Sequence, residues 1–590
     1  MVTKEFEEMK QVLKDTISMV RHPTSKFKVF AWEAGLGKSK FSTEFVAETI
    51  IDSFVNESKI EIPTYLIVKK FKIDVEETVK NINSALGSFG GSGHNNEWVI
   101  GITSENWDEL RKQPEKLDKS LVLVITHQRY IELCEAELPM PFGNRTTLII
   151  DEKIHFPSYS YSKAKYDAVR PKFPYKLQKE FDLLNDELLL KIDELDTNGK
   201  NKINAIIVEF DNTLISSFLK QLKVFGLDSI KEVKEFFVEL KFFYNQEIIY
   251  NNNNFYSYNK TMKLRKLKNN IILDASATLD SVYNGEDFIL IEKRRIVDYS
   301  KSLFIGELKN SSRSSIGKNA KVYMKDAVRG AANILESKRR CLYITHKSEL
   351  KSFADALKEM KVGKESYHLP KAIKSIEDEE FDATIELKDY KLAVNWFGNI
   401  VGQNKYSDFD MCHIIGTNNL PYPVYLIQFA IYNELESIHQ CDLTIEKGKF
   451  KDVEMERVRK GFIAAEFYQA AKRIQRNENP QAIFILVHHD EQVINMIANE
   501  MNNVQFNVIE RISDKDMTKL APNTIGLKLA KHIETLEIGM YKKKEIAAII
   551  GIDTKNLARH IKNPEIQHLI GKGYIVIKHQ SIEVVKKLNS

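Results

Sequence analysis

Residues 27–39 read FKVFAWEAGLGKS, an apolar run that leads into two glycines, a lysine and a serine, and a helix-forming stretch follows. Between a strand and a helix, such a loop lets backbone N–H groups surround phosphate oxygens at the helix N-terminus. We therefore predict a nucleotide-phosphate site formed by Gly35, Leu36, Gly37, Lys38 and Ser39. Lys38 would reach the β- and γ-phosphates of ATP, and the Ser39 hydroxyl would bind Mg²⁺. The alternative is a plain glycine turn beside a surface lysine.

A second motif, which is acidic, fits the same nucleotide chemistry. Residues 147–152 read TLIIDE, so Asp151 and Glu152 follow a buried apolar run. A carboxylate at the end of a neighbouring strand can hold Mg²⁺, and the next one can orient the attacking water. We assign Asp151 to the metal and Glu152 to the water. A purely structural acidic pair is the alternative.

Apolar runs around both motifs predict two α/β lobes. Continuous Val/Ile/Leu runs separated by helical patterns are typical of parallel sheets that are covered on both faces. For the first lobe we expect strands at 27–31, 64–68, 98–103, 121–126, 147–150 and 271–274, and for the second at 341–345, 392–396, 411–415 and 483–487.

Two further segments carry polar groups suited to coupling and catalysis. Residues 271–278 read IILDASAT, an apolar strand that ends in Ser276-Ala277-Thr278. Residues 469–476 have the spacing QxxxRxxR, which places Gln469, Arg473 and Arg476 near one face of a helix. Arginine stays charged and binds phosphate bidentately, so this row could face a γ-phosphate. An exposed basic helix face is the alternative.

The segment 396–408, WFGNIVGQNKYSD, predicts a tight loop after a buried strand. Taken in order, the phosphate loop, Asp-Glu pair, Ser-Ala-Thr, glycine loop and QxxxRxxR resemble the motifs of superfamily 2 helicases. The resemblance implies two recA-like lobes, ATP and Mg²⁺ as cofactors, and coupling through Ser276, Thr278, Gly402 and Asn404. Asn404 stands where many relatives carry Asp.

The resemblance covers about residues 26–155 and 270–490, and we assign no subfamily. His127 and Gln128, after the run 121–126, are similar to that family's Thr-His segment, whereas His155 falls one place late for a strict DEAH box. Residues 156–270 are dominated by helical patterns and resemble the arch insertion of XPD/DinG-type helicases. Four scattered cysteines give no iron–sulfur or zinc spacing.

The end of the chain predicts a small nucleic-acid-binding unit. Residues 518–590 hold 13 Lys/Arg against 6 Asp/Glu, whereas the whole chain has a net charge of only +4. The spacing of Ala547, Gly551 and Leu557 is typical of a helix-turn-helix, with Thr554 as the N-cap of its second helix. Residues then exposed to DNA would be Lys555, Asn556, Arg559 and Lys562, and residues 571–578 could form a wing. A protein-docking module is the alternative.

A basic cluster without acidic residues, which includes Lys263 and Arg265, lies near three aromatic residues at 255–258 and is a second candidate nucleic-acid surface. A solvated basic segment explains it equally well.

These patterns predict the following domains: 1–155, first recA-like lobe; 156–270, helical insertion; 271–310, return to the first lobe and linker; 311–515, second lobe; 516–590, basic winged-helix-like domain. With no apolar run of membrane-spanning length and no secretion signal, we expect a cytoplasmic protein with reduced thiols.

The resulting hypothesis is an ATP-dependent helicase or translocase that acts on nucleic acid, DNA rather than RNA. The C-terminal unit could also bind a protein partner. The other hypothesis is a non-motor DNA-binding replication or regulatory factor with a degenerate ATPase fold.

Overall fold

The chain forms two compact units, Met1–Ile509 and Glu510–Ser590, which are described separately below. The computed structural model describes residues 4–19, 24–55, 62–90, 98–196, 203–291, 296–317, 319, 323, 340–350, 361–362, 365–366, 383–387, 390–400, 405–510, 529–530, 532–533, 535–561, 564–571 and 574–586. Within these residues, no helix has the length and apolar character required to cross a bilayer.

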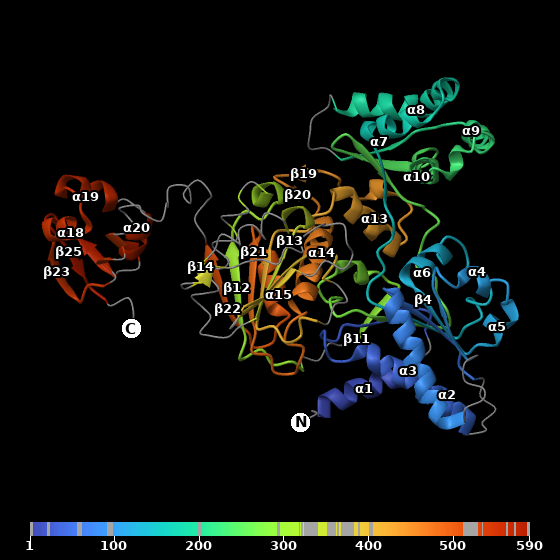
Figure 1. Cartoon of the computed structure of the whole chain (residues 1–590), viewed down its shortest axis with the longest axis horizontal. Coiled ribbons are helices and arrows are strands. Elements are labelled where there is room, and N and C mark those ends of the chain that lie inside the picture. Colours follow the sequence, from blue (N-terminus) through green and yellow to red (C-terminus); the bar gives the residue numbers. More distant parts are fainter. Residues whose placement is uncertain are drawn as a thin grey trace. The chain divides into compact units, whose positions relative to one another are not determined.

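The first lobe is a seven-stranded parallel sheet (Figure 1). Its order is β11 (Phe288–Ile291), β1 (Phe27–Phe30), β10 (Asn269–Leu273), β5 (Thr147–Asp151), β2 (Tyr65–Lys69), β4 (Val122–Thr126) and β3 (Val99–Ile102). Its helices are α1 (Lys4–Ile17), α2 (Lys38–Val55), α3 (Lys72–Gly90), α4 (Trp107–Leu110), α5 (Pro114–Lys119) and α6 (His127–Leu133). All six strands predicted for this lobe are present.

Side chains alternate between the two faces of the sheet along each strand, so the core of this lobe is divided between these faces. Ile149 packs in the apolar cluster that contains side chains of α1, α2 and α3. Its neighbours Leu148 and Ile150 pack in the cluster on the other face, with α5 and α6. The continuous apolar runs in the sequence follow from this burial on both faces.

The second lobe is also a seven-stranded sheet, in which the edge strand β16 is antiparallel to β17. Its order is β16 (Ala383–Leu387), β17 (Tyr390–Trp396), β13 (Arg340–Thr345), β18 (Met411–Ile415), β21 (Ile483–His488), β12 (Leu303–Leu308) and β22 (Gln505–Glu510). Its helices include α13 (Tyr422–Tyr432), α14 (Val453–Ala471) and α15 (Glu491–Asn499), and its short hairpins are β14 (Lys361–Val362) with β15 (Glu365–Ser366) and β19 (Ile445–Glu446) with β20 (Lys449–Phe450). The two sheets confirm the predicted α/β class.

Helix α13 follows a second-lobe strand but packs against the first lobe. Its apolar residues belong to the same cluster as Leu148 and Ile150 of β5. The buried Gln428 amide accepts from the Phe156 N–H at 3.1 Å and donates to the Phe156 carbonyl at 2.7 Å. Tyr432 donates to the Ile154 carbonyl at 2.8 Å. The lobes therefore share one continuous core just beyond the Asp-Glu pair.

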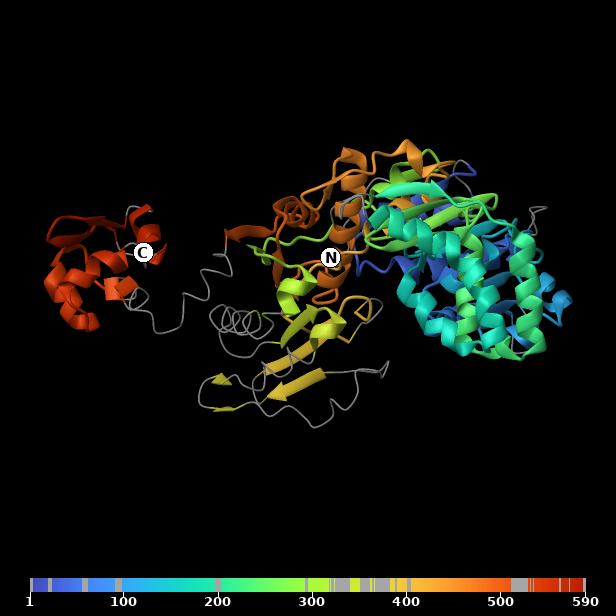
Figure 2. The same ribbon diagram turned by 90° about the horizontal axis from the view of Figure 1, so that it is seen from above.

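The insertion between β5 and β10 contains more strand than its sequence pattern predicts. Its helices are α7 (Lys163–Val169), α8 (Tyr175–Asp196), α9 (Asn212–Val224) and α10 (Lys231–Leu240). A four-stranded antiparallel sheet runs along them, in the order β6 (Tyr159–Tyr161), β9 (Asn254–Ser257), β8 (Glu247–Asn251), β7 (Asn204–Ile207) (Figure 2). Asn252 and Asn253 both have positive φ, at 49° and 59°, so the asparagine run is a tight hairpin turn rather than the end of a helical region.

The described part of the C-terminal unit includes three short helices and a three-stranded antiparallel sheet. Its elements are β23 (Gly539–Lys542), α18 (Lys543–Ile550), α19 (Thr554–Ile561), α20 (Pro564–Gly571), β24 (Ile575–Ile577) and β25 (Ser581–Val584). Gly551 ends α18 in the left-handed region, at φ 75°. Asp553 Oδ1 accepts from the Lys555 N–H at 2.9 Å. The capping side chain of α19 is therefore Asp553, not the predicted Thr554, because the helix begins at Thr554, one residue earlier than we assumed.

Candidate active site between the two lobes

The predicted phosphate loop connects β1 to α2. Gly35 and Gly37 have φ values of 92° and 78°, a region that favours glycine. The Lys38 ammonium lies under this loop and donates to the carbonyls of Trp32 at 2.5 Å and Glu33 at 3.2 Å. Leu36 is buried in an apolar cluster shared with the second lobe, so its contribution to a phosphate site is its backbone. The loop thus holds its lysine and backbone in place beside the start of α2.

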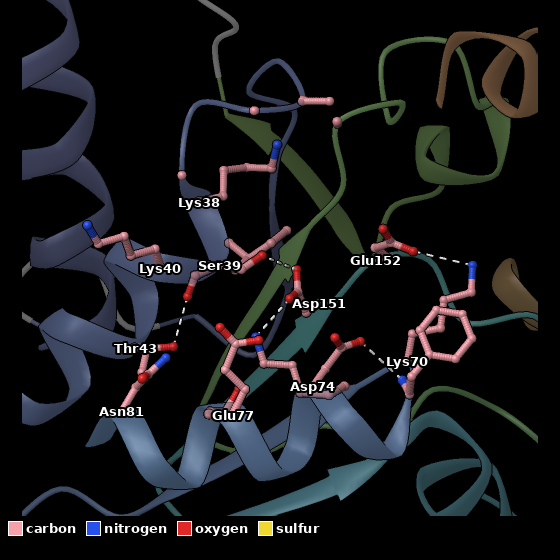
Figure 3. A pocket seen from close by; sticks show the side chains of 18 of the residues that line it. Lys38, Ser39, Lys40, Thr43, Lys70, Asp74, Glu77, Asn81, Asp151 and Glu152 are labelled. Carbon is pink, nitrogen blue, oxygen red and sulfur yellow. Dashed lines mark hydrogen bonds and ion pairs between the residues drawn. The ribbon is translucent and has the colours of Figure 1, made fainter. Parts of the chain in front are cut away.

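Asp151 lies at the end of β5 and faces the start of α2 (Figure 3). Its Oδ1 accepts from the Ser39 hydroxyl at 2.9 Å, and its Oδ2 accepts from the Lys69 ammonium at 2.8 Å. Burial by itself would raise the pKa of Asp151, but Lys69, Ser39 and Lys38 together hold it below its usual value. This carboxyl group is therefore ionised near neutral pH.

Glu152 occupies a strained backbone position next to it. Its φ is +69°, which is unusual for a residue with a side chain, and its N–H donates to the Leu273 carbonyl at 3.0 Å. Such strain concentrates where the surrounding structure fixes a functional group. The Glu152 carboxylate forms an ion pair with Lys70 at 3.3 Å (Figure 3) and lies 3.9 Å from Arg473.

His127 holds the backbone of the same acidic pair. Its Nε2 donates to the Asp151 carbonyl at 2.8 Å, because a carbonyl oxygen can only accept. Burial lowers the pKa of His127 to about 4, so the ring is neutral at neutral pH. Thr126 caps helix α6 through its side chain, which fixes the position of His127 at the first turn.

The second lobe contributes the predicted QxxxRxxR residues. Gln469, on α14, donates to the Ser276 hydroxyl at 2.9 Å, and this hydroxyl donates to Asp274 at 2.7 Å. Arg473 is buried, and burial lowers its pKa. The Arg476 side chain packs on the phosphate loop, where a Cβ added to Gly35 would lie 3.0 Å from the Arg476 Cβ. Burial also lowers the pKa of Arg476, to about 10.

These groups line one cavity of about 850 Å³. Its first-lobe wall includes Gly35, Gly37, Lys38, Ser39, Asp151 and Glu152, and its second-lobe wall includes Ser407, Gln469, Arg473 and Arg476. The size falls within the range of small-molecule and cofactor sites, and the lining is mainly polar and charged. Six of these ten residues come from the predicted phosphate and Asp-Glu motifs, so the structure brings these motifs together with the arginine row.

The donors also fit a magnesium ion. Mg²⁺ prefers oxygen ligands and is usually held by one or two protein groups together with waters and substrate phosphates. The Ser39 hydroxyl and the Asp151 carboxylate lie within hydrogen-bonding distance and both line the cavity. No group of three or more His, Cys, Asp or Glu side chains suited to a metal occurs among the described residues.

The remaining coupling residues are only partly described. Ser276 is buried and Thr278 is exposed at the end of the Ser-Ala-Thr segment. Gly402 and Asn404 lie outside the described residues. Ser407, which follows them, lines the cavity and accepts from the Gln475 N–H through its carbonyl at 3.1 Å.

The basic cluster before β10 has acidic partners that its local sequence does not reveal. Lys263 pairs with Glu434 at 3.1 Å, and the Arg265 guanidinium donates to the Cys134 carbonyl at 3.1 Å. Phe255 and Tyr258, which we considered for base stacking, are buried. In this conformation these two rings are not accessible for stacking, Tyr256 is only half-buried, and much of the basic charge is already paired.

In the C-terminal unit, Lys555 and Asn556 are exposed on the first turn of α19. Arg559 belongs to the same helix, but its side chain is outside the described part of the structure, as is all of Lys562. The structure therefore places two of the four predicted DNA-contacting residues on a solvent-exposed helix.

Sequence reasoning missed Lys69 and Lys70, which pair with both members of the acidic motif. A signal existed, since two lysines follow directly on a predicted strand. What the sequence lacks is the order of strands: β2 lies beside β5 in the sheet, with Val68 opposite Ile150. The following residues, Lys69 and Lys70, therefore lie beside Asp151 and Glu152.

No family model matches the chain, and no curated protein matches it. Among solved structures, Xpd4 of S. tokodaii superposes with a TM-score of 0.50 and 10% identity, over 86% of this chain and 100% of that one. An XPD helicase gives a TM-score of 0.49 and 11% identity, over 87% and 100% of the respective chains. The DUF1998 helicase MrfA bound to DNA gives 0.33 and 9%, over 98% and 60%. With its two largely parallel sheets and the cavity between them, the chain has the two-lobed fold of Xpd4 of S. tokodaii.

Proposed function

We propose that this chain hydrolyses ATP in the cavity between its lobes and uses the reaction to move along nucleic acid, as a superfamily 2 helicase or translocase. The observation that carries the proposal is the composition of the cavity. Phosphate-loop and acidic residues of one lobe face Gln469, Arg473 and Arg476 of the other. A site divided in this way can link nucleotide state to the relative position of the lobes.

Each group has a role that its position supports. Lys38 and the backbone of residues 35–39 bind the phosphates, while Ser39 and Asp151 hold the Mg²⁺, which neutralises phosphate charge when bound. Glu152 orients the attacking water, and its strained backbone keeps the carboxylate at the cavity wall. Arg473 and Arg476 stabilise the charge that develops during phosphoryl transfer.

Coupling would pass through the Ser-Ala-Thr segment and the loop at 396–408. Ser276 receives the Gln469 hydrogen bond from the other lobe, so a change at the γ-phosphate can reach the strand β10. Thr278, Gly402 and Asn404 are assigned to the same task by their place in the motifs.

We propose DNA as the substrate because the basic C-terminal unit exposes Lys555 and Asn556 on a short helix after a glycine turn. Arg559 and Lys562 would extend this surface, and Lys263 and Arg265 are further candidates on the first unit. Phosphate contacts by such residues supply most of nonspecific affinity.

The test is ATP turnover by the full chain with no nucleic acid, with single-stranded DNA and with single-stranded RNA, alongside strand displacement on 3′- and 5′-tailed duplexes. We expect DNA-stimulated turnover that is lost in Lys38→Ala. Nucleotide binding without turnover under all three conditions would instead favour a DNA-binding factor with a degenerate ATPase fold.

A further inference from the structure

A buried lysine neutralises the carboxylate that we assign to the metal. Lys69 is the last residue of β2, and its side chain is only 5% exposed. Its ammonium lies 2.8 Å from Asp151 Oδ2, while Ser39 occupies the other oxygen of the same carboxylate at 2.9 Å. Both oxygens of Asp151 are therefore already engaged by donors in this conformation.

This arrangement follows from the sheet and not from a flexible side chain. Strands β2 and β5 are parallel neighbours, with Val68 opposite Ile150, so the next residue of each strand, Lys69 and Asp151, lies at the same edge of the sheet. The ion pair lies in the wall of the cavity, because Lys69, Ser39 and Asp151 all line it. Lys70 repeats the pattern one residue later, but it pairs with Glu152 and is 25% exposed.

We propose that Lys69 takes the place of the metal cation at Asp151. Its ammonium pairs with the Asp151 carboxylate before Mg²⁺ and ATP bind, and it must release that carboxylate when Mg²⁺ enters with ATP. The inference rests on the proposed role of Asp151 and Ser39 in metal binding. A dication approaching Asp151 meets both a repelling ammonium and a carboxylate whose charge is already neutralised. Metal alone should therefore bind weakly.

The nucleotide changes this balance. Because Lys69 lines the cavity, the phosphates of ATP offer the ammonium a new anionic partner when it leaves Asp151. Metal and nucleotide then bind cooperatively, since each removes an obstacle to the other. The Lys69–Asp151 ion pair would thus weaken the binding of a metal ion when no ATP is bound.

The test compares Mn²⁺ binding to the nucleotide-free full chain, measured by the loss of the free Mn²⁺ signal in electron paramagnetic resonance. We expect Lys69→Met to bind Mn²⁺ about tenfold more tightly than the wild type, which corresponds to about 1.4 kcal/mol. Lys69→Arg keeps the cation and should behave like the wild type. Lys70→Met removes the neighbouring cation that pairs with Glu152 and should change the affinity much less.

A second readout is the cooperativity itself. The factor by which ATP tightens Mn²⁺ binding should be smaller in Lys69→Met than in the wild type, because the obstacle is already absent. If Lys69→Met does not fold, as judged by circular dichroism, Lys69→Gln replaces it with the same expectation, since its amide can still donate to Asp151.

Equal or weaker Mn²⁺ binding by the uncharged Lys69 variant, in a protein whose wild type turns over ATP with Mg²⁺, would overturn the proposal. That outcome would make Lys69 either a structural residue or a phosphate ligand only. Failure of the proposed function looks different, because the wild type would then show no Mg²⁺-dependent turnover, and Asp151→Asn would leave Mn²⁺ binding unchanged.

Discussion

The hydrogen bond between Gln469 and Ser276 joins the two lobes beside the cavity, and its removal has a calculable effect. Gln469→Ala removes one neutral hydrogen bond, which is worth about 1 kcal/mol. Ser276→Ala removes the same bond and also the bond to Asp274, so we expect about 2–3 kcal/mol. Asp274 keeps two donors, the Ser276 N–H at 2.8 Å and the Tyr283 hydroxyl at 3.0 Å, which limits the loss.

The assay is a double-mutant cycle on nucleic-acid-stimulated ATP turnover, with each rate ratio converted to a free energy. Both single variants lose the same interlobe bond, so the double variant should fall short of additivity by about 1 kcal/mol, roughly a fivefold difference in rate. A matched control pairs Gln469→Ala with Glu286→Ala, because Glu286 is exposed and has no assigned role in the site or in coupling. That cycle should be additive.

Additivity within about 0.3 kcal/mol for Gln469 and Ser276 would refute the reasoning, since independent sites behave in this way. It would mean that the bond plays no part in the step that limits turnover. Strand displacement per ATP, measured on the same variants, would then show whether the contact affects movement alone.

Four other changes test the remaining assignments. Glu152→Gln should still bind ATP but lower turnover by about 10²-fold or more, measured by nucleotide-binding and steady-state assays. Arg476→Ala should keep nucleotide binding and lose stimulation by nucleic acid, a contribution that reaches about 10³–10⁵ for arginine fingers, and intact stimulation would contradict its role. The double substitution Lys555→Ala and Arg559→Ala should weaken duplex binding and make its salt slope shallower by roughly 1.8, if each residue neutralises one phosphate. His127 has a pKa of about 4 in the folded protein and about 6.5 in the unfolded chain. Its contribution to the free energy of unfolding is therefore complete above pH 6.5 and is lost as the pH falls toward 4. In urea unfolding, the stability of His127→Gln should fall by up to about 3 kcal/mol less than that of the wild type over this pH range.

The sequence predicts most of the core of both sheets because each strand is a local apolar run. Strands such as β5 and β18 need no knowledge of their neighbours, since burial on both faces makes them continuous. The phosphate loop and the Asp-Glu pair are readable for the same reason, as each is a short motif at the end of such a run.

What the sequence could not predict depends on pairing between distant segments. The order β5-β2 places Lys69 beside Asp151, although 82 residues separate them. The insertion sheet forms from four short strands, and two of them flank an asparagine turn that resembles a loop in the sequence. The acidic partner of Lys263 is Glu434, 171 residues away, so a segment without local acids is nevertheless paired.

The contacts between the lobes differ in kind, and this difference indicates where the lobes can rearrange. At α13 the lobes share an apolar core, and separating them would expose that core and leave the buried Phe156 N–H and carbonyl without Gln428. Each Å² of apolar surface that the separation exposes costs about 25 cal/mol.

At the cavity, by contrast, the contacts between the lobes include one hydrogen bond to Ser276, a 3.9 Å ion pair between Arg473 and Glu152, and the packing of Arg476 on the phosphate loop. A bound triphosphate can replace the second of these contacts, because it offers the arginine a stronger anionic partner. We therefore expect the nucleotide to change the lobe contacts at Arg473, where an alternative partner is available, while α13 keeps the two lobes attached.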